Sequence, residues 1–145
     1  MLSTDQKGTI AELAIAARAI ELGVEVYRPV AEGGRYDLIV DAGGRLLRVQ
    51  CKWATTDHSV VAIRCRRCRR TRDGLLHRGY SADEIDGIAA YCHAIDRCFY
   101  LSIEEIAGRM TVQLRLEETR NNQSQLINWA ADFGLERLQS TSSGP

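Results

Sequence analysis

Four polar residues stand where a helix or a strand would otherwise supply apolar side chains to a core. Glu12 lies in a stretch with helical periodicity, and Asp37 opens a short apolar run. Gln50 and Lys52 are two residues apart in another apolar-rich stretch, so on a strand they share one face. Carboxylate, amide and main-chain oxygens bind Mg²⁺, which activates a water, and an ammonium stabilises the charge that grows on a phosphate. The set suits hydrolysis of a phosphodiester bond.

Each of the four residues also has a purely structural interpretation. Asp37 can cap a turn, and Glu12 can be a solvated residue on a helix surface. Gln50 and Lys52 can form the solvent-facing side of an antiparallel sheet, since such sheets are commonly exposed on one face. Taken one at a time, the residues fit both the catalytic and the structural interpretation. The predicted helix and strands decide whether the four side chains can come together.

Periodicity predicts the elements of the first half of the chain. A helix is expected over residues 5–22, with apolar residues at three- and four-residue steps and Ser3 or Thr4 as its cap. Strands are expected at 24–26, 36–40, 46–53 and 59–65. If the strands 36–40 and 46–53 form a hairpin around Gly43-Gly44, then Asp37, Gln50 and Lys52 can converge on one side of the sheet, and the helix can place Glu12 over the same spot.

The second half is predicted to continue one α/β domain. Residues 66–79 are expected to be an exposed, arginine-rich loop, followed by strands at 87–93 and 98–101. Ser102 with Glu105 indicates a capped short helix, and a strand at 112–116 and a helix at 125–133 follow. A length of 145 residues allows one domain, which we place at 1–139, with a disordered tail at 140–145.

Charge is unevenly distributed although the chain is neutral overall, with 19 Lys and Arg against 19 Asp and Glu. Residues 43–80 hold ten Lys and Arg against two Asp, a net charge of +8, which leaves −8 on the remainder. Such a segment is typical of a nucleic-acid contact, although a solvated charged loop has the same composition. The expected DNA-binding residues are Arg64, Arg66, Arg67, Arg69, Arg70 and Arg72.

The five cysteines and the lengths of the apolar runs indicate where the protein is located and whether it could bind zinc. An odd cysteine count without an export signal favours reduced thiols in the cytoplasm, and no apolar run is long enough for a membrane span. Cys65 and Cys68 form a C-x-x-C pair, which is half of a zinc signature. Cys92 and Cys98 could supply two further ligands, so a zinc-stabilised binding module is one alternative.

The order and spacing of the motifs resemble the PD-(D/E)XK nuclease superfamily. The motifs that carry this resemblance are Lys7-Gly8 with Glu12, then Tyr36-Asp37-Leu38-Ile39-Val40, then Val49-Gln50-Cys51-Lys52. Further segments are similar to the homing endonucleases of group I introns and, more distantly, to archaeal Holliday-junction resolvases: Tyr80 with Asp83 to Asp86, Ala90-Tyr91-Cys92, Cys98 to Leu101, and Asn121-Asn122-Gln123 with Ile127 to Ala130. The resemblance covers roughly residues 5–133.

The resemblance implies a restriction-endonuclease-like core, a mixed β-sheet flanked by helices. It implies Glu12 and Asp37 as acidic metal-site residues, Gln50 at the second motif position and Lys52 as the catalytic lysine, with the Cys51 carbonyl as a further metal ligand. The implied ion is Mg²⁺, with Mn²⁺ as a substitute. Gln50 stands where an acid is more common, and an amide binds a hard dication less well than a carboxylate.

Two hypotheses follow. The first is a metal-dependent DNA endonuclease, working as a homodimer or homotetramer if it cuts both strands. The second is a catalytically inactive DNA-binding module on the same fold, which the neutral Gln50 keeps open. The sequence does not distinguish a specific duplex site from a four-way junction, a flap or an end as substrate.

Overall fold

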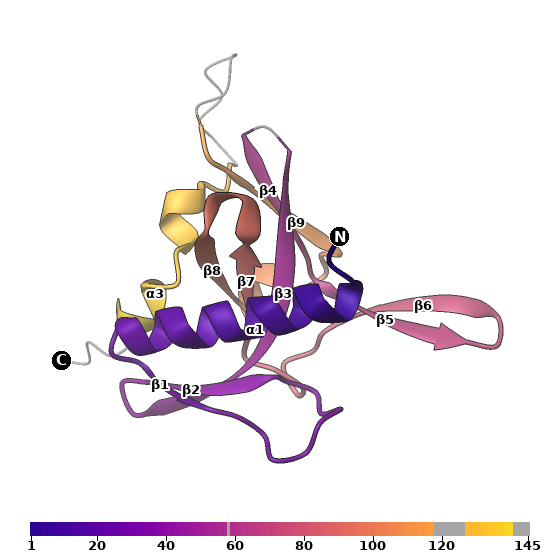
Figure 1. Cartoon of the computed structure of the whole chain (residues 1–145), viewed down its shortest axis with the longest axis horizontal. Helices are drawn as coiled ribbons and strands as arrows, with labels where there is room; N and C mark the ends of the chain where they lie inside the picture. Colours follow the sequence, from indigo (N-terminus) through magenta and orange to yellow (C-terminus); the bar gives the residue numbers. More distant parts are fainter. Residues whose placement is uncertain (58, 118–126, 141–145) are drawn as a thin grey trace.

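The computed structural model describes residues 1–57, 59–117 and 127–140, and of 67–71 and 75–77 only the backbone. These residues form a seven-stranded mixed sheet with one long helix across a face and a separate two-stranded hairpin (Figure 1). The helices are α1 (Thr4–Glu21), α2 (Ile103–Ile106) and α3 (Arg137–Ser140), with 3₁₀ turns η1 (His93–Ile95) and η2 (Ala130–Phe133). The strands are β1 (Glu25–Tyr27), β2 (Leu38–Ala42), β3 (Arg45–Asp57), β4 (Val60–Arg64), β5 (Arg66–Thr71), β6 (Gly74–Gly79), β7 (Gly87–Cys92), β8 (Arg97–Ser102) and β9 (Thr111–Arg115). The α/β prediction is confirmed.

The helix α1 begins and packs as its sequence dictates. The Ser3 hydroxyl accepts the Gln6 N–H at 3.1 Å, and the Gln6 side chain accepts the Ser3 N–H at 2.9 Å, which is a capping box. Ala11, Ile15 and Ala19 are buried against one face of the sheet. Glu12, next to Ala11, therefore lies at the margin of this contact.

The predicted hairpin around Gly43-Gly44 is confirmed. Both glycines have positive φ, 69° and 86°, which other residues adopt only at a cost, and the Asp41 carboxylate accepts the Gly44 N–H at 2.6 Å. The resulting antiparallel register places Leu38 opposite Val49. Asp37 is thereby held beside the middle of β3.

The strand β3 changes its antiparallel partner half-way along its length. It pairs with β2 as far as Val49 and with β4 from Thr55 onward, while its other edge pairs in parallel with β7. Among the described strands, none pairs with the edge of β3 between Val49 and Thr55. This free edge is where the candidate catalytic residues lie, and the pairing with β4 explains why β3 runs beyond the predicted end at residue 53.

Three predictions about the elements need correction. Residues 66–79 are an antiparallel hairpin, β5–β6, and not a loop, because backbone pairing across a tight turn needs no apolar face. The helix expected at 125–133 is wrong over its described part, which is extended before η2; residues 125 and 126 lie outside the described residues. Ser140, assigned to the tail, ends α3, and the other tail residues, 141–145, are also outside that range.

The four-cysteine zinc site is excluded by the two cores. Cys98 is buried with the α1-facing cluster, whereas Cys92 is buried with Cys65 on the opposite side of the sheet, so one ion cannot bind both. Within residues 1–57, 59–117 and 127–140, no three His, Cys, Asp or Glu residues are grouped as for a metal ion.

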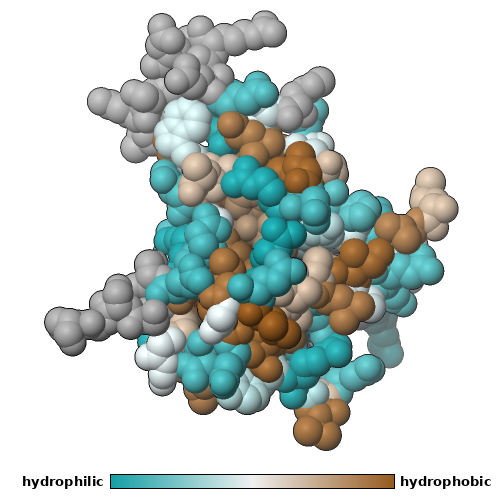
Figure 2. Space-filling view, turned by 60° about the vertical axis from the view of Figure 1, so that its left-hand side comes forward, coloured by the Kyte–Doolittle hydropathy of each residue, from teal (hydrophilic) through white to brown (hydrophobic). Residues whose placement is uncertain are grey.

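The surface carries hydrophobic side chains in separate patches. On the face in Figure 2 these patches alternate with hydrophilic ones, and exposed large hydrophobic residues of α1 and β1 include Leu13, Ile20 and Tyr27. In the described part of the chain, no helix is long and apolar enough to cross a membrane.

An ion pair fastens β3 to the segment before β7. The Asp86 carboxylate accepts the Arg48 backbone N–H at 2.7 Å and its Nε at 3.1 Å, and Arg48 also donates to the carbonyls of Asp83 and Ala82 at 2.8 and 2.9 Å. Burial alone would raise the pKa of Asp86, but the hydrogen bonds from Arg48 hold this pKa below its ordinary value.

The Asp86→Asn substitution is expected to lower the free energy of unfolding by about 1–3 kcal/mol at pH 7, because it weakens hydrogen bonds to a charged group. A lowered pKa in the folded state means that this stabilisation is present above the unfolded carboxyl pKa of about 4 and is lost as the pH falls through the folded pKa. Urea unfolding of both proteins at pH 7 and pH 3 measures the effect. An equal difference at the two pH values would contradict the assignment.

Candidate active site

The Asp37 carboxylate is fixed at the free edge of β3. Its Oδ2 accepts the backbone N–H of Cys51 at 2.9 Å, and its own N–H donates to the Val49 carbonyl at 2.9 Å. In a strand, the N–H and C=O of one residue point to the same side, so the Cys51 carbonyl also faces this edge. A carboxylate and a main-chain carbonyl are thus presented together.

Glu12 reaches the same edge from α1. Its Oε1 accepts Nη2 of Arg28 at 2.6 Å, with side chains 23% and 62% exposed. A pocket of about 620 Å³ is lined by Glu12, Arg28 and Asp37 together with the loop of residues 29–34. The two candidate acids therefore share one open cavity.

The charge state of Asp37 reflects these neighbours. Burial raises the pKa of its carboxyl above the ordinary value, against the hydrogen bond from the Cys51 N–H, which lowers it. The negative charge of Glu12 raises the pKa further, and the positive charge of Lys52 lowers it. The structure therefore brings Glu12, Asp37 and Lys52 within electrostatic reach of each other.

Lys52 extends from the face of β3 opposite α1. Val49, Cys51 and Trp53 pack toward α1, so the alternate residues Gln50 and Lys52 point to the other face. Glu12, Asp37 and Lys52 lie around the edge of β3, with Glu12 on the α1 side and Lys52 and Gln50 on the opposite face. The expected convergence on one side of the sheet is therefore wrong.

The Lys52 ammonium is held by its surroundings. Nζ donates to the Arg66 carbonyl at 3.1 Å and lies 5.0 Å from the centroid of the Tyr80 ring, a cation–π contact. Arg66 begins the β5–β6 hairpin and Tyr80 follows it, so the hairpin starts and ends beside the lysine.

The arginine-rich segment is placed next to this site by β4 and β5. Arg64 ends β4 and is exposed, and Arg72 is exposed in the hairpin turn. Arg66, Arg67, Arg69 and Arg70 belong to β5. The hairpin projects away from the sheet (Figure 1), so six arginines follow a continuous route from the neighbourhood of Lys52 outward.

Sequence reasoning missed Arg28 as a site residue. It stands alone before Pro29 in a polar loop, and nothing in its spacing relates it to Glu12, sixteen positions earlier. Tyr80 is one of the residues that carry the resemblance, but the sequence predicts no role for it. It lies beside Lys52 only because the β5–β6 hairpin folds the chain back to that residue.

Comparisons with known proteins agree with this geometry. A family model described as PD-(D/E)XK endonuclease matches residues 2–136. The solved structure of a bacterial homing endonuclease, I-Ssp6803I, has a TM-score of 0.75 and 21% sequence identity, and the match covers 99% of this chain and 100% of that chain; at this identity it shows a shared fold. No curated protein matches the sequence. Because the family model spans almost the whole chain, this protein belongs to the PD-(D/E)XK endonuclease family and is a nuclease.

Proposed function

We propose that the protein is a Mg²⁺-dependent DNA endonuclease, for which Mn²⁺ can substitute, and that its active site is the free edge of β3. One observation carries the proposal: the Asp37 carboxylate is held on the Cys51 N–H, close enough to Glu12 and Lys52 for both charges to shift its pKa. Two acids and an ammonium around a main-chain carbonyl are the groups that phosphodiester hydrolysis requires.

The donor set at this edge fits a divalent cation. Asp37, Glu12 and the Cys51 carbonyl supply hard oxygen ligands, with the Gln50 amide adjacent in the strand. The N–H of Cys51 occupies Oδ2 of Asp37, which orients the carboxylate. When bound, the ion polarises the phosphate and lowers the pKa of a coordinated water.

Lys52 is assigned the stabilisation of the negative charge that develops on the scissile phosphate. The Arg66 carbonyl and the Tyr80 ring hold the ammonium in place without neutralising it, since neither carries a formal charge. A positioned charge of this kind contributes most where water is excluded.

We assign contact with the phosphates of the DNA backbone to the arginines of β4, β5 and the hairpin turn. Guanidinium groups bind phosphate in a bidentate manner, and the hairpin begins at the residue whose carbonyl holds Lys52. DNA cut at the β3 edge therefore passes the hairpin.

A cleavage assay tests the proposal. Supercoiled plasmid and branched duplexes are incubated with wild-type protein, with Lys52→Ala and with the exposed-site control Arg97→Ala, each in Mg²⁺, Mn²⁺ or EDTA. We expect metal-dependent cutting by wild type and by Arg97→Ala, and a loss of about 10²-fold or more in Lys52→Ala. Equal cutting by Lys52→Ala would dismiss the assigned site, and salt-sensitive binding without cutting of any substrate would favour the inactive DNA-binding module.

The oligomeric state is part of the same proposal. One active site cuts one strand, so double-strand cleavage requires at least two copies, as a homodimer or homotetramer. Linear product formed in a single binding event, together with a mass above 16.2 kDa in light scattering, would support this; nicked product from a monomer would contradict it.

Arg28 is expected to compete with the metal ion for Glu12. A partly exposed ion pair is worth about 0.2–1 kcal/mol, so Arg28→Met is expected to tighten Mn²⁺ binding by about 1.4- to fivefold. Isothermal titration calorimetry measures the affinity without any reaction. Arg35→Met, an exposed arginine of the same loop, is the matched control, and an unchanged affinity in Arg28→Met would show that Glu12 is not a ligand.

A further inference from the structure

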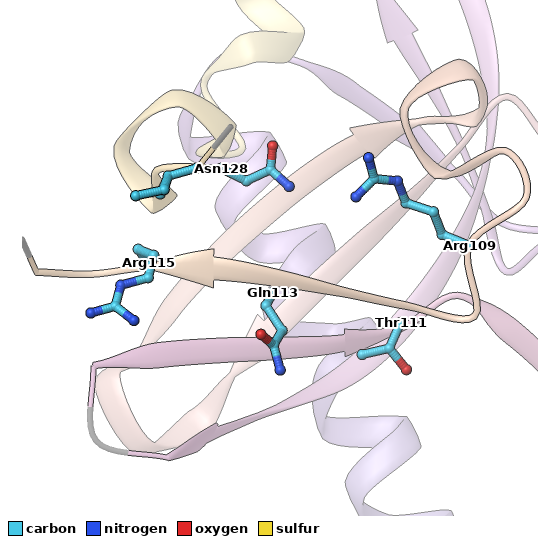
Figure 3. A pocket seen from close by; sticks show the side chains of 6 residues that line it. Arg109, Thr111, Gln113, Arg115 and Asn128 are labelled. Atoms are coloured by element: carbon cyan, nitrogen blue, oxygen red, sulfur yellow. The ribbon is translucent and has the colours of Figure 1, made fainter. Parts of the chain in front are cut away.

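A second polar pocket, of about 370 Å³, lies against the outer surface of β9 (Figure 3). Arg109 and Arg115 lie at its two ends in this view, with hydroxyl and amide side chains between them. Its lining residues are Arg109, Thr111, Gln113, Arg115, Ile127 and Asn128.

The polar side chains of β9 are not needed by the core. Val112 and Leu114 are buried, whereas the alternate residues Thr111 and Gln113 are exposed. Side chains on one face of a strand recur about every 6.6 Å, which is about twice the 3.4 Å rise per base pair of duplex DNA. Arg, Gln and Asn are also the side chains that pair with base edges and phosphates.

Arg115 holds a donor that lacks an acceptor. Its Nε is buried and has no hydrogen-bond partner among the residues that the structure describes. Its backbone is fixed, since its N–H donates to the Asn128 carbonyl at 2.8 Å. A buried charged donor without a partner is costly, so an anionic ligand in this pocket would remove the cost.

The pocket adjoins the start of the arginine-rich segment through the pairing of β9 with β4. Arg64 of β4 pairs in register with Thr111, which adds a third arginine at the Arg109 end of the pocket. The Cys65 N–H donates to the Met110 carbonyl at 2.9 Å, and the next residue, Arg66, accepts the bond from Lys52. Arg64, Arg66 and Arg109 therefore lie near the junction of β4 and β5, and Arg115 lies at the far end of β9.

We propose that the outer surface of β9 is a second DNA contact, which binds the duplex backbone through Arg109 and Arg115 and presents Gln113 and Asn128 to the groove. This inference rests on the proposed function, since it assigns the same DNA a longer path on the protein. It gives the nuclease a surface, separate from the chemical step, on which binding and selection of the duplex take place.

Fluorescence anisotropy with a labelled mixed-sequence 30-base-pair duplex in EDTA tests this assignment, because no cutting occurs without metal. Arg109→Gln and Arg115→Gln are each expected to weaken binding about tenfold and to reduce the slope of log K against log salt by about 1. Because Arg115 is partly buried, the exposed Arg109 provides a variant that leaves the fold intact. Arg45→Gln is the matched control, because Arg45 is an exposed arginine at the start of β3, in the part that pairs with β2 and not with β4.

The outcomes separate this inference from the proposed function. Binding by both β9 variants equal to that of wild type, or a loss no larger than that of Arg45→Gln, overturns the β9 contact while the nuclease assignment stands. A change of oligomeric state in the β9 variants by light scattering also overturns it, since the surface would then bind another copy of the chain. A wild-type protein that neither binds nor cuts the duplex removes the proposed function itself.

Discussion

Replacing Asp37 by asparagine is expected to reduce metal-dependent cleavage by about 10³-fold or more, because the substitution removes a ligand group worth several kcal/mol of transition-state stabilisation. The same substitution is expected to leave the metal-free protein as stable as wild type or more stable. The amide oxygen still accepts the Cys51 N–H, while the buried charge and its repulsion with Glu12 disappear. Asp37→Asn is therefore expected to lower the cleavage rate without lowering the free energy of unfolding.

The pH dependence of this stability difference has a definite sign. The pKa of Asp37 is raised in the folded protein, chiefly by burial, so its ionisation opposes folding. The advantage of Asp37→Asn in EDTA is expected to vanish below the ordinary carboxyl pKa of about 4 and to reach its full size above the raised pKa. Thermal unfolding of both proteins across this range measures it.

A surface carboxylate provides the control for Asp37→Asn. Asp132 is exposed in η2, away from β3, and Asp132→Asn is expected to change neither cleavage nor the dependence of stability on pH. A large loss of stability in Asp37→Asn, or normal cleavage, would mean that the carboxylate serves the fold and not the reaction.

Removal of the hairpin charges is expected to abolish tight DNA binding without harming the active site. Replacement of Arg66, Arg67, Arg69, Arg70 and Arg72 by glutamine is expected to lower duplex affinity by about 10²-fold or more at 200 mM salt, and to reduce the salt slope by up to about 4.5. The β5–β6 hairpin is a sheet of its own, and Lys52 bonds to the Arg66 backbone, so Lys52 keeps this partner in the variant.

Hydrolysis of a small phosphodiester separates binding from chemistry in this variant. Bis(4-nitrophenyl) phosphate has no extended backbone for the hairpin to hold, so its metal-dependent hydrolysis is expected to match that of wild type, while plasmid cutting is lost. A duplex affinity equal to that of wild type in this variant would mean that the arginines form a solvated surface and do not contact DNA.

The elements around the candidate active site could be predicted from the sequence because local signals fix them. The cap at Ser3 starts α1, the Gly43-Gly44 turn sets the register of β2 and β3, and this register places Asp37 beside Cys51. Each of these signals acts within a few residues. The positions of Glu12 and Asp37 therefore needed only the helix and one hairpin, whereas Lys52 lies on the face opposite α1, beside a hairpin that the sequence did not predict.

The remaining features depend on contacts that spacing does not encode. The strand β5 is mostly arginine, and the two leucines of β6 are adjacent in sequence, so no apolar alternation marks the hairpin. The Arg28 contact with Glu12 requires the loop after β1 to return to α1. The β9 pocket is completed by Asn128, which lies beside Arg115 only in the folded chain.

The change of partner along β3 has a consequence for solubility. An unpaired strand edge offers N–H and C=O groups to the edges of other molecules, which is a route to aggregation. At Cys51 the Asp37 carboxylate occupies the exposed N–H and brings a negative charge to this edge. The carboxylate that we propose as a metal ligand thus also protects the open strand edge against intermolecular β-pairing.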